Sequence, residues 1–278
     1  MAVRDENYTS YDGPLHEGRA WWPVAAQTFR SAVGFLRTKL VVLLLWIAPI
    51  VAAVGVVAEY TMLQQSASNP SPAVVSGLLR VQFYSLAGLF AASGCNAVSD
   101  DLQYDALRLY ASKPIELWEY AAGKVAGLFA LGALVTILPT TVVGGLRIAM
   151  LGAGDYGTTA AAQVGWSLLI ATGMTVVLSA IMAGVSSLSG RTWRVFLAWI
   201  GIILVPVVVG LIVNLAPGGG PWGDLLSLQG NFTMVADLAL KSSSLPVPVW
   251  SPFAVLVTVM AIGLATLYWQ LRRRAALD

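Results

Sequence analysis

The sequence is short of charged side chains. Charged residues make up only 11% of its 278 positions, whereas an average soluble domain carries about 25%. Hydrophobic types make up 57%. A soluble domain of this size could not cover its surface with so few charges, and it would expose apolar patches that promote aggregation. The composition therefore excludes a soluble enzyme, a disordered chain and a fibrous rod, and it indicates a polytopic membrane protein.

Histidine and cysteine are equally scarce. His16, in the polar N-terminal region, is the only histidine, which excludes a histidine-rich zinc site and makes Ser–His catalysis untenable. Cys95 is the only cysteine, so the chain cannot form an internal disulfide. The net charge of +2 implies no strongly basic face, and we expect no nucleic-acid partner.

Six charge-poor stretches are each long enough to form a helix across the hydrocarbon core, which takes about 20 residues. These stretches are residues 40–58, 81–99, 125–146, 164–187, 195–215 and 252–271. Repeated ten-residue segments of alternating polarity, which are typical of a membrane barrel, are missing. The predicted fold is therefore an all-α membrane protein with six transmembrane helices.

The lysines and arginines predict which side each loop occupies. With the N-terminus inside, thirteen of the sixteen fall on the cytoplasmic side, and only Arg80, Arg147 and Lys241 fall outside. This distribution predicts cytoplasmic N- and C-termini, with a polar arm at 1–19 and a tail at 272–278. The first apolar run follows a long polar arm, which favours an uncleaved signal anchor over a removable signal peptide.

Residues 20–39 form an amphipathic pattern before the first span. The apolar positions recur at helical spacing and are Trp22, Ala25, Phe29, Val33, Leu36 and Leu40, while Gln27, Arg30, Arg37 and Thr38 fall on the other side. Pro23 suits the start of a helix. The pattern predicts a helix lying in the inner membrane interface. The alternative is that the first span simply extends into the cytosol.

Residues 99–124 carry an unusual density of charge between spans two and three. Three acids, Asp100, Asp101 and Asp105, end span two. Two short helices are predicted to follow, separated by a break at Pro114, because proline disfavours helix in the residue before it. The second of these covers 116–123. A segment with this length and four aromatic residues favours a docking element for a partner, although a solvated loop is the alternative.

This stretch resembles the corresponding region of ABC-2 type membrane subunits of ATP-binding-cassette transporters. The matching residues are Asp100-Asp101, Asp105-Ala106-Leu107, Ser112-Lys113-Pro114, Tyr120 and Gly123-Lys124. The likeness extends to the interfacial N-terminal helix, the six spans and the two cytoplasmic termini. It implies an ABC-2 type transmembrane domain over 20–271.

The resemblance further implies that 99–124 is a coupling segment received by a separate ATPase subunit. The implied coupling residues are Asp100, Asp101, Tyr104, Asp105, Leu107, Ser112, Pro114, Glu116, Tyr120 and Lys124. The chain lacks a G-x-x-x-x-G-K-[ST] phosphate loop, so we expect no enzymatic activity and no cofactor in it. ATP and Mg²⁺ would sit on two partner ATPase subunits. The expected setting is an exporter in a bacterial or archaeal inner membrane.

Residues 216–251, between the last two spans, form a second non-spanning segment. After a glycine-rich start, Leu225, Leu228, Phe232, Val235 and Leu238 recur at helical spacing. This pattern predicts short amphipathic pieces that dip into the outer leaflet, as the family has at this place. A loop resting on the lipid surface, without a role in transport, is the alternative.

Polar residues within the spans are candidates for a substrate path, because polar groups in a bilayer face protein or water. They are Gln82, Tyr84, Ser85, Ser93, Asn96, Pro206 and Asn214. The resemblance implies a dimer, with a second copy of this or a related chain, whose first, second and fifth spans line the path. For any single residue, interhelical packing is the alternative, with Gly123 and Gly127 as a small-residue pair. No acid or base is predicted to lie deep in a span.

Two other functions stay open at this level. Asp100, Asp101 and Asp105 could hold Mg²⁺ for an intramembrane enzyme acting on a prenyl diphosphate, although such sites use a second aspartate cluster that this chain lacks. A membrane scaffold or channel without an ATPase would leave the length of 99–124 unexplained.

Overall fold

The chain is described by a computed structural model that covers residues 21–65, 70–104, 116–152, 156–216, 220–240 and 247–275. Every regular element within these residues is a helix. Six helical stretches are long and apolar enough to cross a membrane: Leu36–Gln64, Ala73–Gln103, Leu117–Leu151, Gly157–Ser186, Thr192–Leu215 and Ser251–Arg274. The chain is therefore a helical multi-pass membrane protein, and the prediction of six spans is confirmed.

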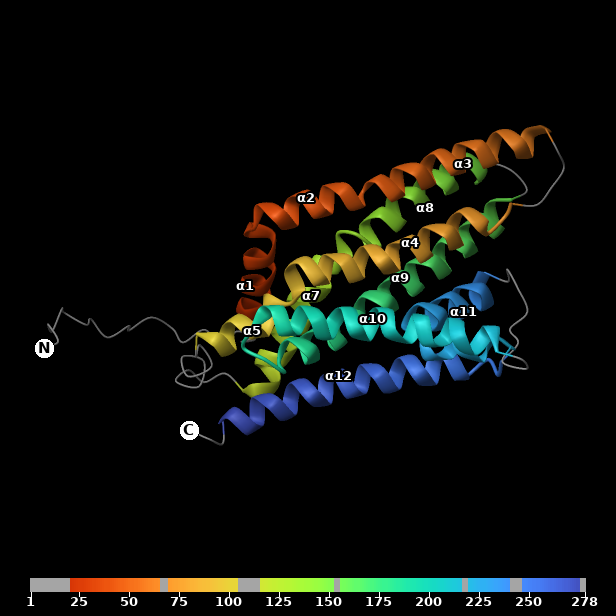
Figure 1. Ribbon diagram of the computed structural model, residues 1–278. Coiled ribbons are helices and arrows are strands. Elements are labelled where there is room, and N and C mark those ends of the chain that lie inside the picture. The colour runs from red at the N-terminus through yellow and green to blue at the C-terminus, as the bar shows by residue number, and fades with distance from the viewer. Residues whose placement is uncertain are drawn as a thin grey trace, which may run out of the picture.

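The first span is preceded by a helix of its own, α1 (Trp21–Gly34). Phe35 has an extended backbone, which separates α1 from α2 (Leu36–Leu45) and turns it sharply away from the span (Figure 1). Helix α3 (Ile47–Gln65) completes the span after a turn at Trp46. The predicted polar stripe was wrong at one position, because Thr38 is fully buried. The placement of α1 in a membrane interface stays a prediction.

Spans two and three are both interrupted. Span two consists of α4 (Ala73–Leu89), a π-helical turn η1 (Phe90–Gly94) and α5 (Asn96–Gln103). Span three consists of α7 (Leu117–Ala133) and α8 (Ile137–Leu151). Pro139 explains the break in span three. In an unbroken helix its ring would clash with the carbonyl oxygen of the residue four positions earlier.

The helix predicted over 116–123 is present from Leu117, but it is not a separate short element. These residues are the start of α7, which continues into span three without a break. Glu116 and Glu119 form a capping box at the start of this helix. The side chain of each residue accepts a hydrogen bond from the backbone N–H of the other.

Helix α9 (Gly157–Ser186) is the central helix of the bundle, and most of its residues are buried. It packs against α12 (Ser251–Ala275) at a small-residue crossing. A Cβ atom on Gly184 would lie 2.4 Å from the carbonyl oxygen of Gly263, so only glycine permits this approach. Helix α10 (Thr192–Leu215) runs unbroken through Pro206, and its buried Trp199 donates to the carbonyl of Ala87 in α4 at 2.9 Å.

Among the described residues between the last two spans there are two short helices, η2 (Gly220–Leu226) and α11 (Leu228–Leu240). Helix α11 contacts α4, α9 and α12, and its Phe232 and Leu228 are buried against them. The predicted helical spacing is therefore present, with part of the apolar face covered by the bundle. Whether these helices enter a leaflet stays a prediction.

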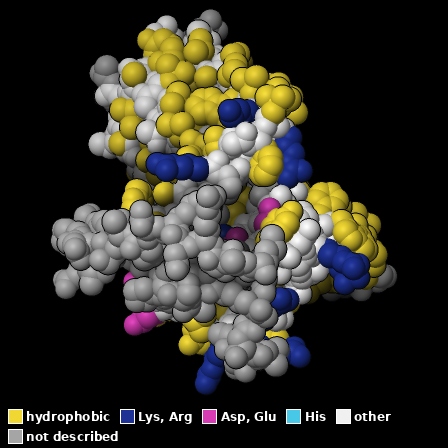
Figure 2. Space-filling model, turned by 90° about the vertical axis from the view of Figure 1, so that its left-hand side faces the viewer, with side chains coloured by type: hydrophobic (Ala, Val, Ile, Leu, Met, Phe, Trp, Pro, Cys, Tyr) yellow, Lys and Arg dark blue, Asp and Glu magenta, His cyan; other side chains and the backbone are white. Residues whose placement is uncertain are grey.

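The two ends of the helical bundle are formed by different helices. Helices α1 and α5, the start of α7 and the C-terminal end of α12 lie together at what we call the terminal end (Figure 1). The opposite end, where α11 lies, is called the distal end. Viewed from the terminal end, the described residues show more basic side chains than acidic ones (Figure 2). This distribution matches the side predicted to be cytoplasmic, although the direction of insertion stays a prediction.

Candidate functional site

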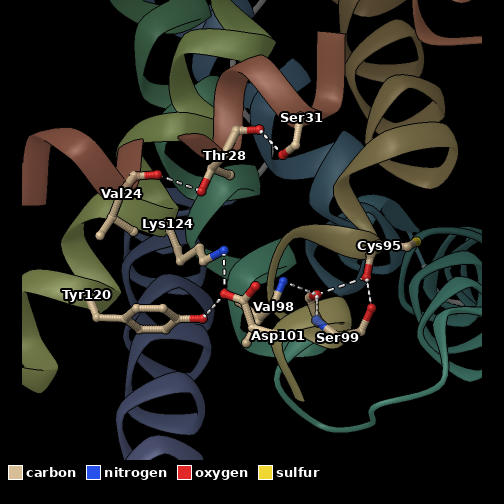
Figure 3. Close-up of polar contacts among 10 residues, drawn as sticks. Val24, Thr28, Ser31, Cys95, Val98, Ser99, Asp101, Tyr120 and Lys124 are labelled. Carbon is tan, nitrogen blue, oxygen red and sulfur yellow. Dashed lines mark hydrogen bonds and ion pairs between the residues drawn. The ribbon is translucent and has the colours of Figure 1, made fainter. Parts of the chain in front are cut away.

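The predicted coupling residues meet where span two ends and span three begins. The carboxylate of Asp101 in α5 lies 2.7 Å from the Nζ of Lys124 in α7. The same oxygen, Oδ2, accepts a hydrogen bond of 2.6 Å from the hydroxyl of Tyr120, one helical turn before Lys124 (Figure 3). The Lys124 ammonium also lies over the Tyr120 ring, 5.4 Å from its centroid. We call these three residues the α5–α7 joint.

The joint is withdrawn from solvent. The Lys124 side chain is only 5% exposed, the Asp101 side chain is 19% exposed, and Tyr120 is buried. The attraction within a buried ion pair offsets the cost of removing both charges from water only when the remaining polar atoms of the pair also form hydrogen bonds. The phenol supplies one of these bonds, so α5 and α7 are held in one geometry.

A second set of contacts fixes α5 to α9 and α10. The Ser186 hydroxyl, at the end of α9, accepts hydrogen bonds from the backbone N–H of Val98 (2.9 Å) and Ser99 (3.1 Å). It donates in turn to the carbonyl of Cys95 at 2.9 Å. Thr192, the first residue of α10, donates to Asp100 Oδ1 at 3.5 Å. The end of span two is thus anchored to spans three, four and five.

Helix α1 packs directly on the joint through small residues of α7. A Cβ on Gly123 would lie 2.6 Å from the carbonyl oxygen of Trp21, and one on Gly127 would lie 2.6 Å from the Cβ of Thr28. The Thr28 hydroxyl is turned inward and bonds the carbonyl of Val24 at 2.9 Å (Figure 3). The predicted small-residue pair is therefore a helix-packing site, and its partner is α1.

A π-helical turn precedes the joint within span two. The backbone N–H of Cys95 bonds the carbonyl of Phe90, five residues earlier, and Ser93 donates to the carbonyl of Leu89 at 2.8 Å. Such turns insert one residue into an α-helix and are frequent at functional sites. Here the turn sets which face of α5 presents Asp101 to α7.

Not all predicted coupling residues belong to the joint. Tyr104 ends the described part of span two and is 75% exposed. Glu116 starts α7 and is exposed, and its carboxylate accepts a hydrogen bond from the indole N–H of Trp118. Asp105, Leu107, Ser112 and Pro114 lie outside the described residues. In the described part of the segment, the residues of the α5–α7 joint are therefore buried, whereas Tyr104 and Glu116 are exposed.

The predicted path residues do not share one surface of the chain. Gln82 is buried and donates to the carbonyl of Thr136 (3.1 Å) and to the Thr140 hydroxyl (2.9 Å), which satisfies groups at the break in span three. Ser85 and Ser93 are buried as well. For Gln82 the packing interpretation is the one that the contacts support.

The remaining path candidates lie elsewhere. Tyr84 is 47% exposed on the side of the bundle, while Asn96 and Pro206 are partly buried. Asn214 accepts a hydrogen bond of 2.8 Å from the Gly223 backbone and donates to Asp224, so it fixes η2 to the distal end of α10. A path lined by spans one, two and five stays a prediction that needs a second chain.

The sequence analysis missed a buried ion pair at the distal end. Arg147 in α8 lies 2.9 Å from Glu59 in α3 and also donates to the carbonyl of Ser71 at 2.9 Å. The Arg147 side chain is 0% exposed. Both residues lie near the distal ends of their helices, so the pair does not contradict the expectation that no acid or base lies deep in a span. The opposite charges near the distal ends of these two spans were the available signal.

The sequence matches no protein-family model and no curated protein.

Proposed function

We propose that this chain is the membrane-spanning permease subunit of an ATP-binding-cassette exporter. Its substrate path would form between two such chains, and two separate ATPase subunits would drive it from the cytoplasm. The observation that carries the proposal is the α5–α7 joint, in which Asp101 of span two is held by Lys124 and Tyr120 of span three.

The joint gives a physical route for coupling. The residues between Tyr104 and Glu116 connect two helices that are already tied together through buried charge. A push on that connection would move α5 and α7 as one body, since buried, hydrogen-bonded packing is not continuously deformable. Helix α1 would follow because it packs on α7, and α9 and α10 would be pulled through Ser186 and Thr192.

The same contacts count against a magnesium enzyme at this place. Asp101 already faces a lysine ammonium, and Asp100 accepts a hydrogen bond from Thr192. A divalent cation bound between these two aspartates would lie next to the positive charge of Lys124, which opposes its binding.

The first experiment is stoichiometric co-purification from the native host in mild detergent. The proposal predicts that an ATP-binding subunit accompanies the chain. Purification of the chain with no such subunit would contradict it.

The second experiment uses an exposed residue, because substitution of buried Asp101 would confuse coupling with stability. Tyr104→Ala should reduce transport-linked ATP hydrolysis of the purified complex while the thermal unfolding of the chain is unchanged. Trp193→Ala is the matched control, since Trp193 is also an exposed aromatic (59%) at the terminal end but lies outside the segment. Equal activity of the two variants would refute docking at Tyr104.

A further inference from the structure

A groove of about 540 Å³ lies between α7 and α12, near the terminal end. Its walls come from Trp118, Ala122 and Ala126 of α7 and from Leu264 and Tyr268 of α12, and Val176 of α9 forms its floor. The alanines create the hollow, because a larger side chain at either place would fill it. The volume lies within the range of sites that bind small molecules, which is roughly 300–1,000 Å³.

The groove lies within the membrane-spanning part of both helices, and aromatic residues stand at its terminal rim. Trp118, in the first turn of α7, is 55% exposed, and Tyr268 is 47% exposed. Tryptophan and tyrosine are enriched at the depth of lipid headgroups. The groove therefore runs from headgroup depth into the hydrocarbon region.

Basic residues follow the groove directly. Arg272 comes four residues after Tyr268 and eight after Leu264, so it continues the same face of α12 by one turn. Arg273 and Arg274 come next, and Arg273 stacks over Trp269, 5.6 Å from the ring centroid. On the opposite wall the acids are Glu116 and Glu119, which are engaged in the capping box of α7. Arg273 is engaged by this stacking, so Arg272 is the cationic side chain that the rim offers to an anionic group.

We propose that this groove binds an anionic phospholipid, with one acyl chain between α7 and α12 and the phosphate beside Arg272. An apolar groove that is followed by Arg272 fits a molecule with an apolar chain and an anionic head. Helices α7 and α12 contact one another, so the space between them is too narrow for a partner helix, which measures 10–12 Å across. The proposal is independent of the proposed transport function.

Bound at this place, the lipid would touch the first part of α7, which also carries Lys124 and Tyr120 on its other side. It would also join α7 to the last span, which is otherwise in limited contact with it. An anionic lipid would therefore stabilise the terminal end of the bundle.

The test uses the purified full-length chain in nanodiscs of phosphatidylcholine that contain a photoactivatable phosphatidylglycerol. Cross-links should concentrate on residues 118–129 and 264–268. Arg272→Gln should weaken phosphatidylglycerol binding about fivefold, which corresponds to about 1 kcal/mol for one arginine near an anionic headgroup. Ala126→Phe should abolish the cross-links by filling the groove.

Two matched controls separate this site from general lipid contact. Arg273→Gln removes an arginine that is stacked on Trp269, and Ala130→Phe adds the same bulk at an exposed alanine of α7 outside the groove. Both should leave cross-linking unchanged. Labelling spread evenly over the lipid-facing helices, an equal loss in the variants and their controls, or equal labelling by phosphatidylcholine would overturn the proposal. Arg272→Gln adds no bulk, so it decides the matter even where Ala126→Phe disturbs folding.

Discussion

Among the described residues, two buried ion pairs lie at opposite ends of the bundle and differ in how completely their polar atoms are hydrogen-bonded. Asp101–Lys124, at the terminal end, is completed by the hydroxyl of Tyr120. Glu59–Arg147, at the distal end, leaves Arg147 Nε and Nη1 and Glu59 Oε2 buried without a hydrogen-bond partner among the described residues. A buried pair with unmatched groups is a poor source of stability. The comparison indicates a firm joint at the terminal end and a weaker contact at the distal end.

This difference fits the proposed transporter, in which the ATPase subunits would act on the terminal end of the bundle. The terminal joint would transmit a push without yielding, whereas the distal contact between α3 and α8 would separate at lower cost. Four substitution experiments test this difference between the two ends, in order of decreasing expected effect.

The largest effect is expected from Asp101→Ala. It would leave the ammonium of Lys124 buried without a counter-charge, at a cost of about 3–5 kcal/mol in the free energy of unfolding. Thermal unfolding in detergent, followed by circular dichroism, measures the loss. The double variant Asp101→Ala/Lys124→Met should recover most of it. A double variant no more stable than the single one would show that the pair is not what holds the joint.

Helix α1 can be tested through the glycines of α7. Gly127→Ala would place a methyl group against Thr28 and the carbonyl of Ala25, and overpacking of this kind costs about 1–3 kcal/mol. Gly145→Ala in α8 is the control, because a Cβ there meets nothing within 4 Å. The control should be neutral or slightly stabilising, since alanine favours helix. Equal unfolding temperatures in the two variants would rule out tight packing of α1 on α7.

Gln82→Leu should have a moderate effect. It would remove the hydrogen bonds that the Gln82 side chain forms with Thr136 and Thr140 at the break in span three, at a cost of about 1–3 kcal/mol. Tyr84→Leu, two residues away and exposed, is the control for a polar residue of span two that lies outside the network. Transport by the two variants would also separate packing from a role in the path.

The smallest change is expected from Glu59→Leu/Arg147→Met. Replacement of both members of an incompletely bonded buried pair by apolar residues is often neutral or stabilising. The unfolding temperature should therefore stay the same or rise, in contrast to the loss expected at Asp101. A large loss of stability would mean that the distal pair is as firmly integrated as the terminal one, and the contrast between the two ends would fail.

The spans could be predicted from sequence because membrane crossing depends on local composition, which the sequence displays directly. The small-residue pair Gly123 and Gly127 was also visible. The breaks were harder to predict, because the turn at Phe35 and the π-turn at 90–94 depend on how the helix ends pack rather than on any break in the apolar pattern.

The site was only partly predictable. Asp101, Tyr120 and Lys124 were singled out as exposed docking residues, whereas the structure buries them against one another. Their mutual contact depends on the angle at which spans two and three cross, which periodicity does not report. The pair Glu59 and Arg147 is separated by 88 positions, and only the opposite charges near the distal ends of two spans pointed to it.

Docking of an ATP-binding partner on residues 99–124 can be tested by site-specific photo-cross-linking in the native host. A photoreactive amino acid at position 104, which is exposed at the terminal end, should capture an ATP-binding subunit. The same residue at position 156, beside the distal start of α9, should not. Capture at 104 alone is the predicted result, and an ATP-binding subunit captured at neither position or equally at both would contradict the account.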